Sequence, residues 1–137
     1  MSKFEDLTPY AYFGEPNELL LNVGWLEGDF KKGQVPERFI EKLKIFLDYS
    51  TLQTRGLHNC PYCERKKKTH TGMTSSNEIR VIGIDGKIYA CPSLIYHYIK
   101  EHSYQPPLEF IMAVLIGPAP DSVAYQSIFN IQKRPKR

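Results

Sequence analysis

Residues 78–104, EIRVIGIDGKIYACPSLIYHYIKEHSY, combine two patterns that decide the fold. Two β-rich arms flank the pair Asp85-Gly86, which suits a type I′ turn, so the first half predicts a β-hairpin. The second half places apolar residues at helical spacing, and Ser93 can serve as the N-cap of this predicted helix. The helix must end before Pro106, because proline cannot continue it. The stretch therefore predicts a hairpin followed directly by a helix.

A pair of cysteines lies upstream, in the stretch NCPYCERKKKTH at residues 59–70. Two thiols separated by two residues form either a redox couple or half of a metal site. Cys60-Pro-Tyr-Cys63 matches the active-site tetrapeptide of glutaredoxins letter for letter, but such a motif needs a hydrophobic strand before it and an amphipathic helix after it. The flanking segments QTRGLHN and ERKKKTHTGMTSS are polar and lack an apolar stripe. The context therefore favours a metal site.

The predicted helix supplies the two further ligands that a tetrahedral site requires. It carries an H-x₄-H pair, within the spacing that zinc fingers use, and Zn²⁺ accepts both thiolate sulfur and imidazole nitrogen. Two sulfurs and two nitrogens fill the coordination shell, and neither Glu64 nor Glu101 stands in an HExxH arrangement. The predicted ligands of a structural Zn²⁺ are therefore Cys60, Cys63, His97 and His102.

The spacing of the two histidines raises one geometric objection. At about 100° per residue, positions five apart on a straight helix point roughly 140° from each other. A last turn that loosens before Pro106 can bring His102 round toward His97. If the turn does not loosen, His58 or Cys91 is the expected replacement for the fourth ligand.

The segments outside this central part supply the remaining elements. Residues 1–18 are rich in Tyr, Phe, Pro and Glu and predict an irregular arm packed by aromatic side chains. The apolar run at residues 19–26 predicts an extended strand, ended by Gly28 and Asp29. Three further helices are predicted: at 36–49, at 107–117, and from a cap at Asp121 or Ser122 onward.

Together these elements predict an α+β fold. It has a small antiparallel sheet with a β-hairpin, packed by about four helices, and a zinc-knuckle or zinc-finger-like substructure. Residues 51–77 predict a loop, and a loop of this length in a compact domain needs something to tie it down, which independently favours a metal. We expect one zinc-stabilised domain at residues 1–132 and a basic C-terminal tail at 133–137.

Composition and charge limit the classes of function. The chain of 137 residues is 42% hydrophobic and 24% charged, which is typical of a globular domain. It has no apolar run long enough to span a membrane and no apolar signal core at its start, so we expect a cytoplasmic protein without a membrane partner. Three cysteines, an odd number, argue against a disulfide framework. The formal net charge of +3 is too small to indicate nucleic acid as the partner.

Four segments carry a resemblance to a known family: FEDLTPYAY, NVGWLE, RGLHNCPYC and NEIRVIGIDGKIYACPSLIYHYIKEHSYQPPLEFIMAV. With its C-x-x-C pair and its later H-Y-I-x-x-H-x-Y-x-P-P segment, the chain resembles an uncharacterised bacterial family of domains of unknown function. The resemblance implies a stand-alone bacterial protein in which the cysteine pair and the histidine segment belong to the family pattern. It also implies that Cys91 departs from that pattern, which weakens Cys91 as a ligand. The family brings no established activity.

The leading hypothesis for function is a non-enzymatic zinc-binding domain that mediates binding to another macromolecule, a protein. The sequence contains no phosphate-binding glycine loop, nucleophile motif or pair of carboxylates at helical spacing. One alternative is a zinc-finger-like protein that binds nucleic acid, with phosphates contacted by Arg65, Lys66, Lys67 and Lys68, although a solvated charged loop is the simpler interpretation of these residues. A further alternative is an enzyme, either a thiol oxidoreductase or a zinc hydrolase, that uses the CPYC motif.

Overall fold

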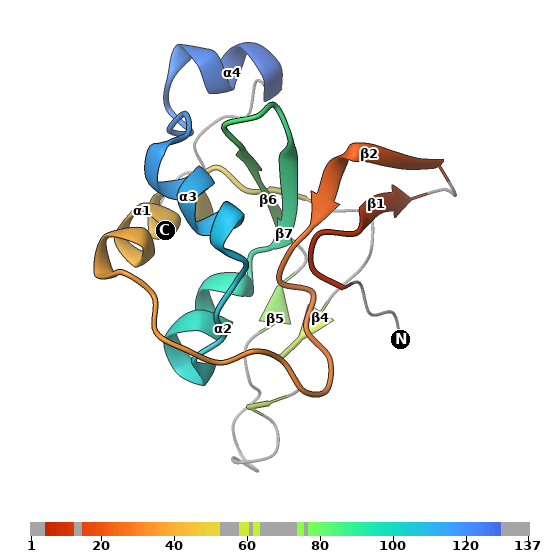
Figure 1. The fold of residues 1–137 in the computed structure, drawn as a ribbon, viewed down its shortest axis with the longest axis vertical. Coiled ribbons are helices and arrows are strands. Elements are labelled where there is room, and N and C mark those ends of the chain that lie inside the picture. Colours follow the sequence, from red (N-terminus) through yellow and green to blue (C-terminus); the bar gives the residue numbers. More distant parts are fainter. Residues whose placement is uncertain are drawn as a thin grey trace.

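The computed structural model describes residues 5–12, 15–52, 58–60, 62–63, 74–75 and 77–129. The strands are β1 (Pro9–Tyr12), β2 (Glu15–Asn22), β3 (Thr51–Leu52), β4 (His58–Asn59), β5 (Thr74–Ser75), β6 (Asn77–Ile82) and β7 (Ile88–Pro92). The helices are α1 (Glu37–Leu47), α2 (Ile95–His102), α3 (Leu108–Ile116) and α4 (Val123–Phe129). The helices gather beside the sheet that contains β6 and β7 (Figure 1). The predicted α+β class is therefore confirmed.

The main sheet has five strands in the order β1-β2-β7-β6-β3. The predicted hairpin is formed by β6 and β7, which pair antiparallel from Glu78↔Pro92 to Ile82↔Ile88. β2 pairs parallel with β7, so the expectation of a wholly antiparallel sheet was wrong at this pair. A separate two-stranded ladder joins β4 to β5 and leads directly into the cysteine pair.

Two segments expected to be irregular contain strands instead. Residues 1–18 were expected to form an arm, but β1 and the start of β2 form an antiparallel pair within them. Residues 51–77 were expected to be a loop, but they hold the short strands β3, β4 and β5. Each of these strands is stabilised by pairing with another segment, and such pairing leaves only a weak local signal in so short a run. Of the strand predicted at 19–26, only residues 19–22 lie in a strand, because β2 begins at Glu15 and ends at Asn22.

The turn between β6 and β7 differs from the predicted type. A type I′ turn at Asp85-Gly86 needs positive φ at both residues, but within this turn only Gly86 has positive φ, at 90°. The N–H of Gly86 donates to the Gly83 oxygen at 3.4 Å, and the N–H of Gly83 donates to the Lys87 oxygen at 2.6 Å. The hairpin therefore closes through a three-residue loop whose glycine takes the left-handed conformation.

The core lies between the sheet and the helices α1 and α3. Phe39 of α1 packs edge-on against Phe110 of α3, with ring centroids 6.0 Å apart. Phe110 packs in turn against Tyr89 of β7 at 5.7 Å. The helix predicted at 36–49 is observed as α1, and the helix predicted at 107–117 is observed as α3. Their buried faces follow the apolar spacing of the sequence.

Ser122, one of the two residues predicted as N-cap, caps the last helix, α4. The Oγ of Ser122 accepts from the N–H of Tyr125 at 3.2 Å, which is the N-cap geometry. Tyr125 is fully buried, and its hydroxyl donates to the carbonyl oxygen of Arg80 at 2.7 Å.

Within the described chain, every helix is too short or too polar to cross a membrane. The predicted tail at 133–137 lies outside the described residues.

Candidate metal centre

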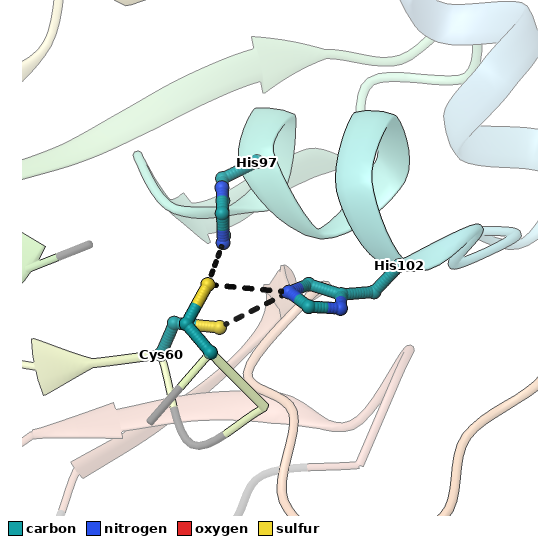
Figure 2. A group of neighbouring side chains, drawn as sticks. Cys60, His97 and His102 are labelled. Carbon is teal, nitrogen blue, oxygen red and sulfur yellow. Dashed lines mark hydrogen bonds between the residues drawn. The ribbon is translucent and has the colours of Figure 1, made fainter. Parts of the chain in front are cut away.

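Four potential ligand atoms converge on one point near the end of α2. The sulfurs of Cys60 and Cys63 and one ring nitrogen each from His97 and His102 all lie within 4.8 Å of one another. Figure 2 shows the two imidazoles turned from the helix toward the sulfurs. These are the four residues predicted from the sequence, and together they could hold a metal ion.

The distances between these atoms suit a tetrahedral ion. The Sγ of Cys63 lies 3.1 Å from the Nε2 of His97 and 3.6 Å from the Nε2 of His102. The Sγ of Cys60 lies 3.5 Å from the same His102 nitrogen. With Zn–S bonds of about 2.3 Å and Zn–N bonds of about 2.0–2.1 Å, a sulfur and a nitrogen on a tetrahedral ion lie about 3.5 Å apart. The donor set and its spacing therefore fit a zinc-sized ion.

The widened end of α2 resolves the objection to two histidines five residues apart. The N–H of Ser103 donates to the Tyr98 oxygen five residues back, and the N–H of Tyr104 donates to the same oxygen at 3.2 Å. An α-helical bond would reach back only four residues, so the last turn is wider than an α-helical turn. Ser103 then leaves the helix in the left-handed conformation, with φ of 62°. The predicted loosening is present, and His102 lies beside His97 with ring centroids 5.0 Å apart.

The start of α2 differs from the prediction. Ser93 was expected as the N-cap, but the N-cap is Leu94, which makes no side-chain cap hydrogen bond. The N–H of Ser93 instead donates to the Asn77 oxygen at 3.0 Å, which ties the entry of the helix to β6.

Other residues considered as ligands or contacts lie elsewhere or outside the described part. Cys91 is fully buried in β7 and does not belong to the four-residue cluster. Glu101 is exposed on α2. His58 lies in β4, with its side chain outside the description. Five more of these residues lie wholly outside the described part of the chain: Glu64, Arg65, Lys66, Lys67 and Lys68.

Burial shapes the chemistry of the cysteine pair. Cys60 is fully buried, and this burial raises the pKa of its thiol. Backbone N–H groups of Tyr62 and Cys63 donate toward its sulfur and oppose that rise in pKa. A thiol redox catalyst instead needs an exposed thiol with a lowered pKa. The N–H donors suit a thiolate that a metal ion neutralises. None of the three cysteines of the chain forms a disulfide.

Tyr62, between the two cysteines, links the cluster to the connection that runs from β2 to α1. Its ring lies 5.5 Å from the His102 ring and 5.0 Å from the Phe30 ring. Its hydroxyl donates to the Gly28 oxygen at 2.8 Å. Sequence reasoning missed this residue, and its only signal was an aromatic ring inside the C-x-x-C motif.

The same connection is held against the end of α2. The N–H of Gly33 donates to the Ser103 oxygen at 3.1 Å, and the N–H of Gln105 donates to the Lys31 oxygen at 2.9 Å. Figure 1 shows this segment passing beside α2 before it enters α1. The candidate metal centre therefore sits where three separate parts of the chain meet.

Comparison with known proteins adds the family but no function. No curated protein and no solved structure matches the chain. A family model described as a domain of unknown function (DUF7919) matches residues 2–115, a range that includes all four residues of the cluster. The chain therefore belongs to the DUF7919 family.

Proposed function

We propose that this protein is a non-enzymatic domain that binds one structural Zn²⁺ and serves as a binding partner for another protein. The observation that carries the zinc proposal is the convergence of Cys60, Cys63, His97 and His102 within 4.8 Å. Two thiolates and two imidazoles are a donor set that zinc accepts in structural sites. The ion would join the turn after β4 to the end of α2.

The completeness of this donor set supports a structural role over a hydrolytic one. A catalytic zinc keeps one position open for water, whereas four protein ligands fill the tetrahedron. Structural zinc contributes about 10–16 kcal/mol in finger peptides, comparable to the net stability of about 5–15 kcal/mol of a whole domain. One ion is therefore enough to fix the turn that carries the two cysteines.

The zinc proposal is tested by counting metal in the purified protein. We expect one zinc per chain by elemental analysis, and after cobalt exchange the visible absorption of a tetrahedral site with two sulfur ligands. Cys60→Ser should lose the metal and lower the melting temperature. Cys91→Ala is the matched control, because it removes a buried thiol outside the cluster and should keep the metal. Metal-free protein whose melting temperature Cys60→Ser leaves unchanged would contradict the proposal.

An exposed apolar stripe on α3 supports a protein as the partner. Leu108, Met112 and Ile116 follow one another at four-residue spacing, with 72%, 37% and 61% of their surfaces exposed. The opposite face of α3 is buried in the core, so these three side chains point away from it. Exposed apolar side chains that gather in this way are typical of contact surfaces.

The partner is tested by capture from a cell extract with the zinc-loaded protein and identification by mass spectrometry. Leu108→Glu together with Ile116→Glu should abolish capture of the identified protein. Replacement of the exposed Lys44 and Glu41 on α1 by Gln should not. Capture that disappears after nuclease treatment would instead favour nucleic acid.

A further inference from the structure

A pocket of about 210 Å³ opens beside the connection from β2 to α1, outside the metal cluster. Three aromatic side chains, Trp25, Phe30 and Tyr104, form part of its lining. Trp25 and Tyr104 are buried, and the indole N–H of Trp25 donates to the Ala90 oxygen at 3.0 Å. Phe30 packs edge-on against Tyr104 with ring centroids 5.9 Å apart. Packing and hydrogen bonding therefore fix these rings in place.

The same pocket concentrates negative charge in a protein whose formal net charge is +3. The residues that line it include four acidic ones, Glu5, Asp6, Glu27 and Asp29, against one basic residue, Lys31. Neither ion pair of the described residues involves any of these carboxylates. The sign of the charge at this pocket is thus opposite to that of the whole chain.

Asp6 has a structural task within this lining. Its Oδ2 accepts from the hydroxyl of Tyr104 at 2.6 Å, and its Oδ1 accepts from the N–H of Gly24 at 3.0 Å. These bonds hold one negative charge in place against the buried aromatic ring. Within the described part of the chain, no ion pair or side-chain hydrogen bond engages the carboxylates of Glu5, Glu27 and Asp29.

Size and lining together select the ligand. Pockets for drug-sized molecules span about 300–1,000 Å³, so this pocket suits a single side chain better than a nucleotide or a cofactor. Aromatic rings attract cations through their faces, and carboxylates attract them through charge. The Phe30 ring already receives one cation, because the ammonium of Lys32 lies 5.3 Å from its centroid.

We propose that this pocket binds the cationic head of an arginine or lysine side chain presented by a partner protein. The proposal deepens the proposed function, because it assigns a recognition chemistry to the protein partner. Arginine is the better fit, because its planar guanidinium can stack on a ring while it donates to carboxylates at the rim.

The pocket is physically connected to the candidate metal centre. Tyr62 contacts His102 on one side and holds the Gly28 oxygen and the Phe30 ring on the other. Phe30 lines the pocket, so the geometry of the cysteine turn sets the position of one aromatic wall. Zinc loading should therefore strengthen binding at the pocket.

The chain provides its own reporter for the test. Trp25 is the only tryptophan of the sequence, so a ligand that enters the pocket changes a single emission signal. The probe is the peptide acetyl-Gly-Gly-Arg-Gly-Gly-amide, titrated into the zinc-loaded full chain. We expect a saturable change in Trp25 fluorescence. The same peptide with citrulline, which keeps the shape of arginine but not its charge, should produce none.

Variants that remove negative charge or positive charge from the pocket test whether charge drives peptide binding. Glu27→Gln with Asp29→Asn should weaken peptide binding about tenfold, and Lys31→Gln should strengthen it because a like charge is removed. The matched controls Glu37→Gln with Glu41→Gln, and Lys44→Gln, change the same charges on the exposed face of α1 and should leave affinity unchanged. All of these sites except Glu27 are exposed, so the variants are expected to fold.

Several outcomes would overturn the proposal. One is the absence of a saturable signal in folded, zinc-loaded protein; another is equal binding of the citrulline peptide; a third is equal loss of affinity in the α1 controls. Zinc is counted in the same samples. Zinc without peptide binding overturns the pocket proposal alone, whereas peptide binding without zinc overturns the zinc proposal alone.

Discussion

Tyr62 links the candidate metal centre to the connection from β2 to α1. Its neighbours in the motif were predictable, because the chemistry of thiolates and imidazoles restricts which residue types can bind zinc and at what spacing. Its own role was not predictable, because a hydrogen bond to the Gly28 oxygen depends on how distant segments meet. Ligands follow from chemistry, whereas the residues that support them follow from tertiary structure.

Tyr62→Phe separates the support of the pocket from the binding of metal. The variant keeps the ring contact with His102 but loses the hydrogen bond to Gly28. We expect full zinc content, a loss of about 1 kcal/mol in the free energy of unfolding, and weaker binding of the arginine peptide. Chemical denaturation and Trp25 fluorescence measure the two effects. Tyr96→Phe, a half-buried neighbour on α2, is the control. An equal effect in the control would remove the special role of Tyr62.

Ser103 is held in a backbone conformation that costs energy for any residue with a Cβ. Its φ of 62° lies in the left-handed region, where glycine is the favoured residue at the end of a helix. Ser103→Gly should therefore raise the free energy of unfolding by about 0.5–1 kcal/mol without loss of zinc. A denaturant titration compares the variant with the original protein. Ser93→Gly is the comparison variant, and it should not stabilise the protein because Ser93 has no positive φ. A destabilised S103G protein would contradict this account.

Cys91 makes the stability of the protein sensitive to alkaline pH. Complete burial raises the pKa of its thiol well above the ordinary value of 9.0. The folded state thus keeps the proton that the unfolded state releases above pH 9. The stabilisation is fully present below this pH and is lost as pH rises toward the folded pKa, at up to about 1.4 kcal/mol per pH unit. Melting temperatures at pH 8 and pH 10.5 should show a smaller decrease for Cys91→Ala than for the original protein. An equal decrease would contradict the assignment.

At the scale of elements, apolar spacing predicted helices correctly and local caps less well. The helices at 36–49 and 107–117 were found within two residues of their predicted ends, because their buried faces repeat with the helical period. The predicted N-cap of α2 and the predicted type of the β6–β7 turn were wrong. The turn is closed by backbone bonds among Gly83, Gly86 and Lys87, and the entry of α2 is bonded to β6 through Ser93 and Asn77.

Gly117, which follows α3, lies close to the backbone of β6. A Cβ at this position would lie 2.5 Å from the carbonyl oxygens of both Ala113 and Ile82, and neither backbone atom can move freely. Gly117→Ala should therefore cost about 1–3 kcal/mol in the free energy of unfolding. Gly33→Ala is the matched control, because the three atoms nearest its new Cβ all belong to the side chain of Gln105 and not to the backbone. Equal destabilisation of the two variants would contradict a backbone clash at Gly117.

At the scale of the whole molecule, the candidate metal centre borders a continuous core, because Cys60 belongs to the same buried cluster as Phe39 and Phe110. The contact between Phe39 of α1 and Phe110 of α3 nevertheless involves none of the four potential ligands. Chelation of zinc should therefore lower the melting temperature and speed hydrogen exchange most in α2 and in the cysteine turn, while α1 and α3 keep more of their protection. Mass spectrometry of exchanged peptides measures this pattern. Uniform loss of protection would show that the two parts unfold together.

The overall class and the grouping of Cys60, Cys63, His97 and His102 followed from the sequence, but the arrangement of the sheet did not. Hydrophobic periodicity marks elements one at a time and does not specify which strands become neighbours. The parallel pairing of β2 with β7 joins Leu20 to Ile88, and nothing in either strand alone indicates that partner. Packing also extends beyond residue 115, where the family match ends, because Tyr125 is buried and bonds to Arg80.

The parallel pair sets an order for events on the ribosome. β1 and β2 leave the exit tunnel first and can pair with each other at once, but the other edge of β2 has to wait until Ile88 to Ala90 have been translated. An unpaired edge is open to wrong neighbours during that wait. Both histidines are translated later still, after the last residue of β7. A metal ion held by all four residues would therefore be captured only after every described strand has been translated, late in the synthesis of the chain.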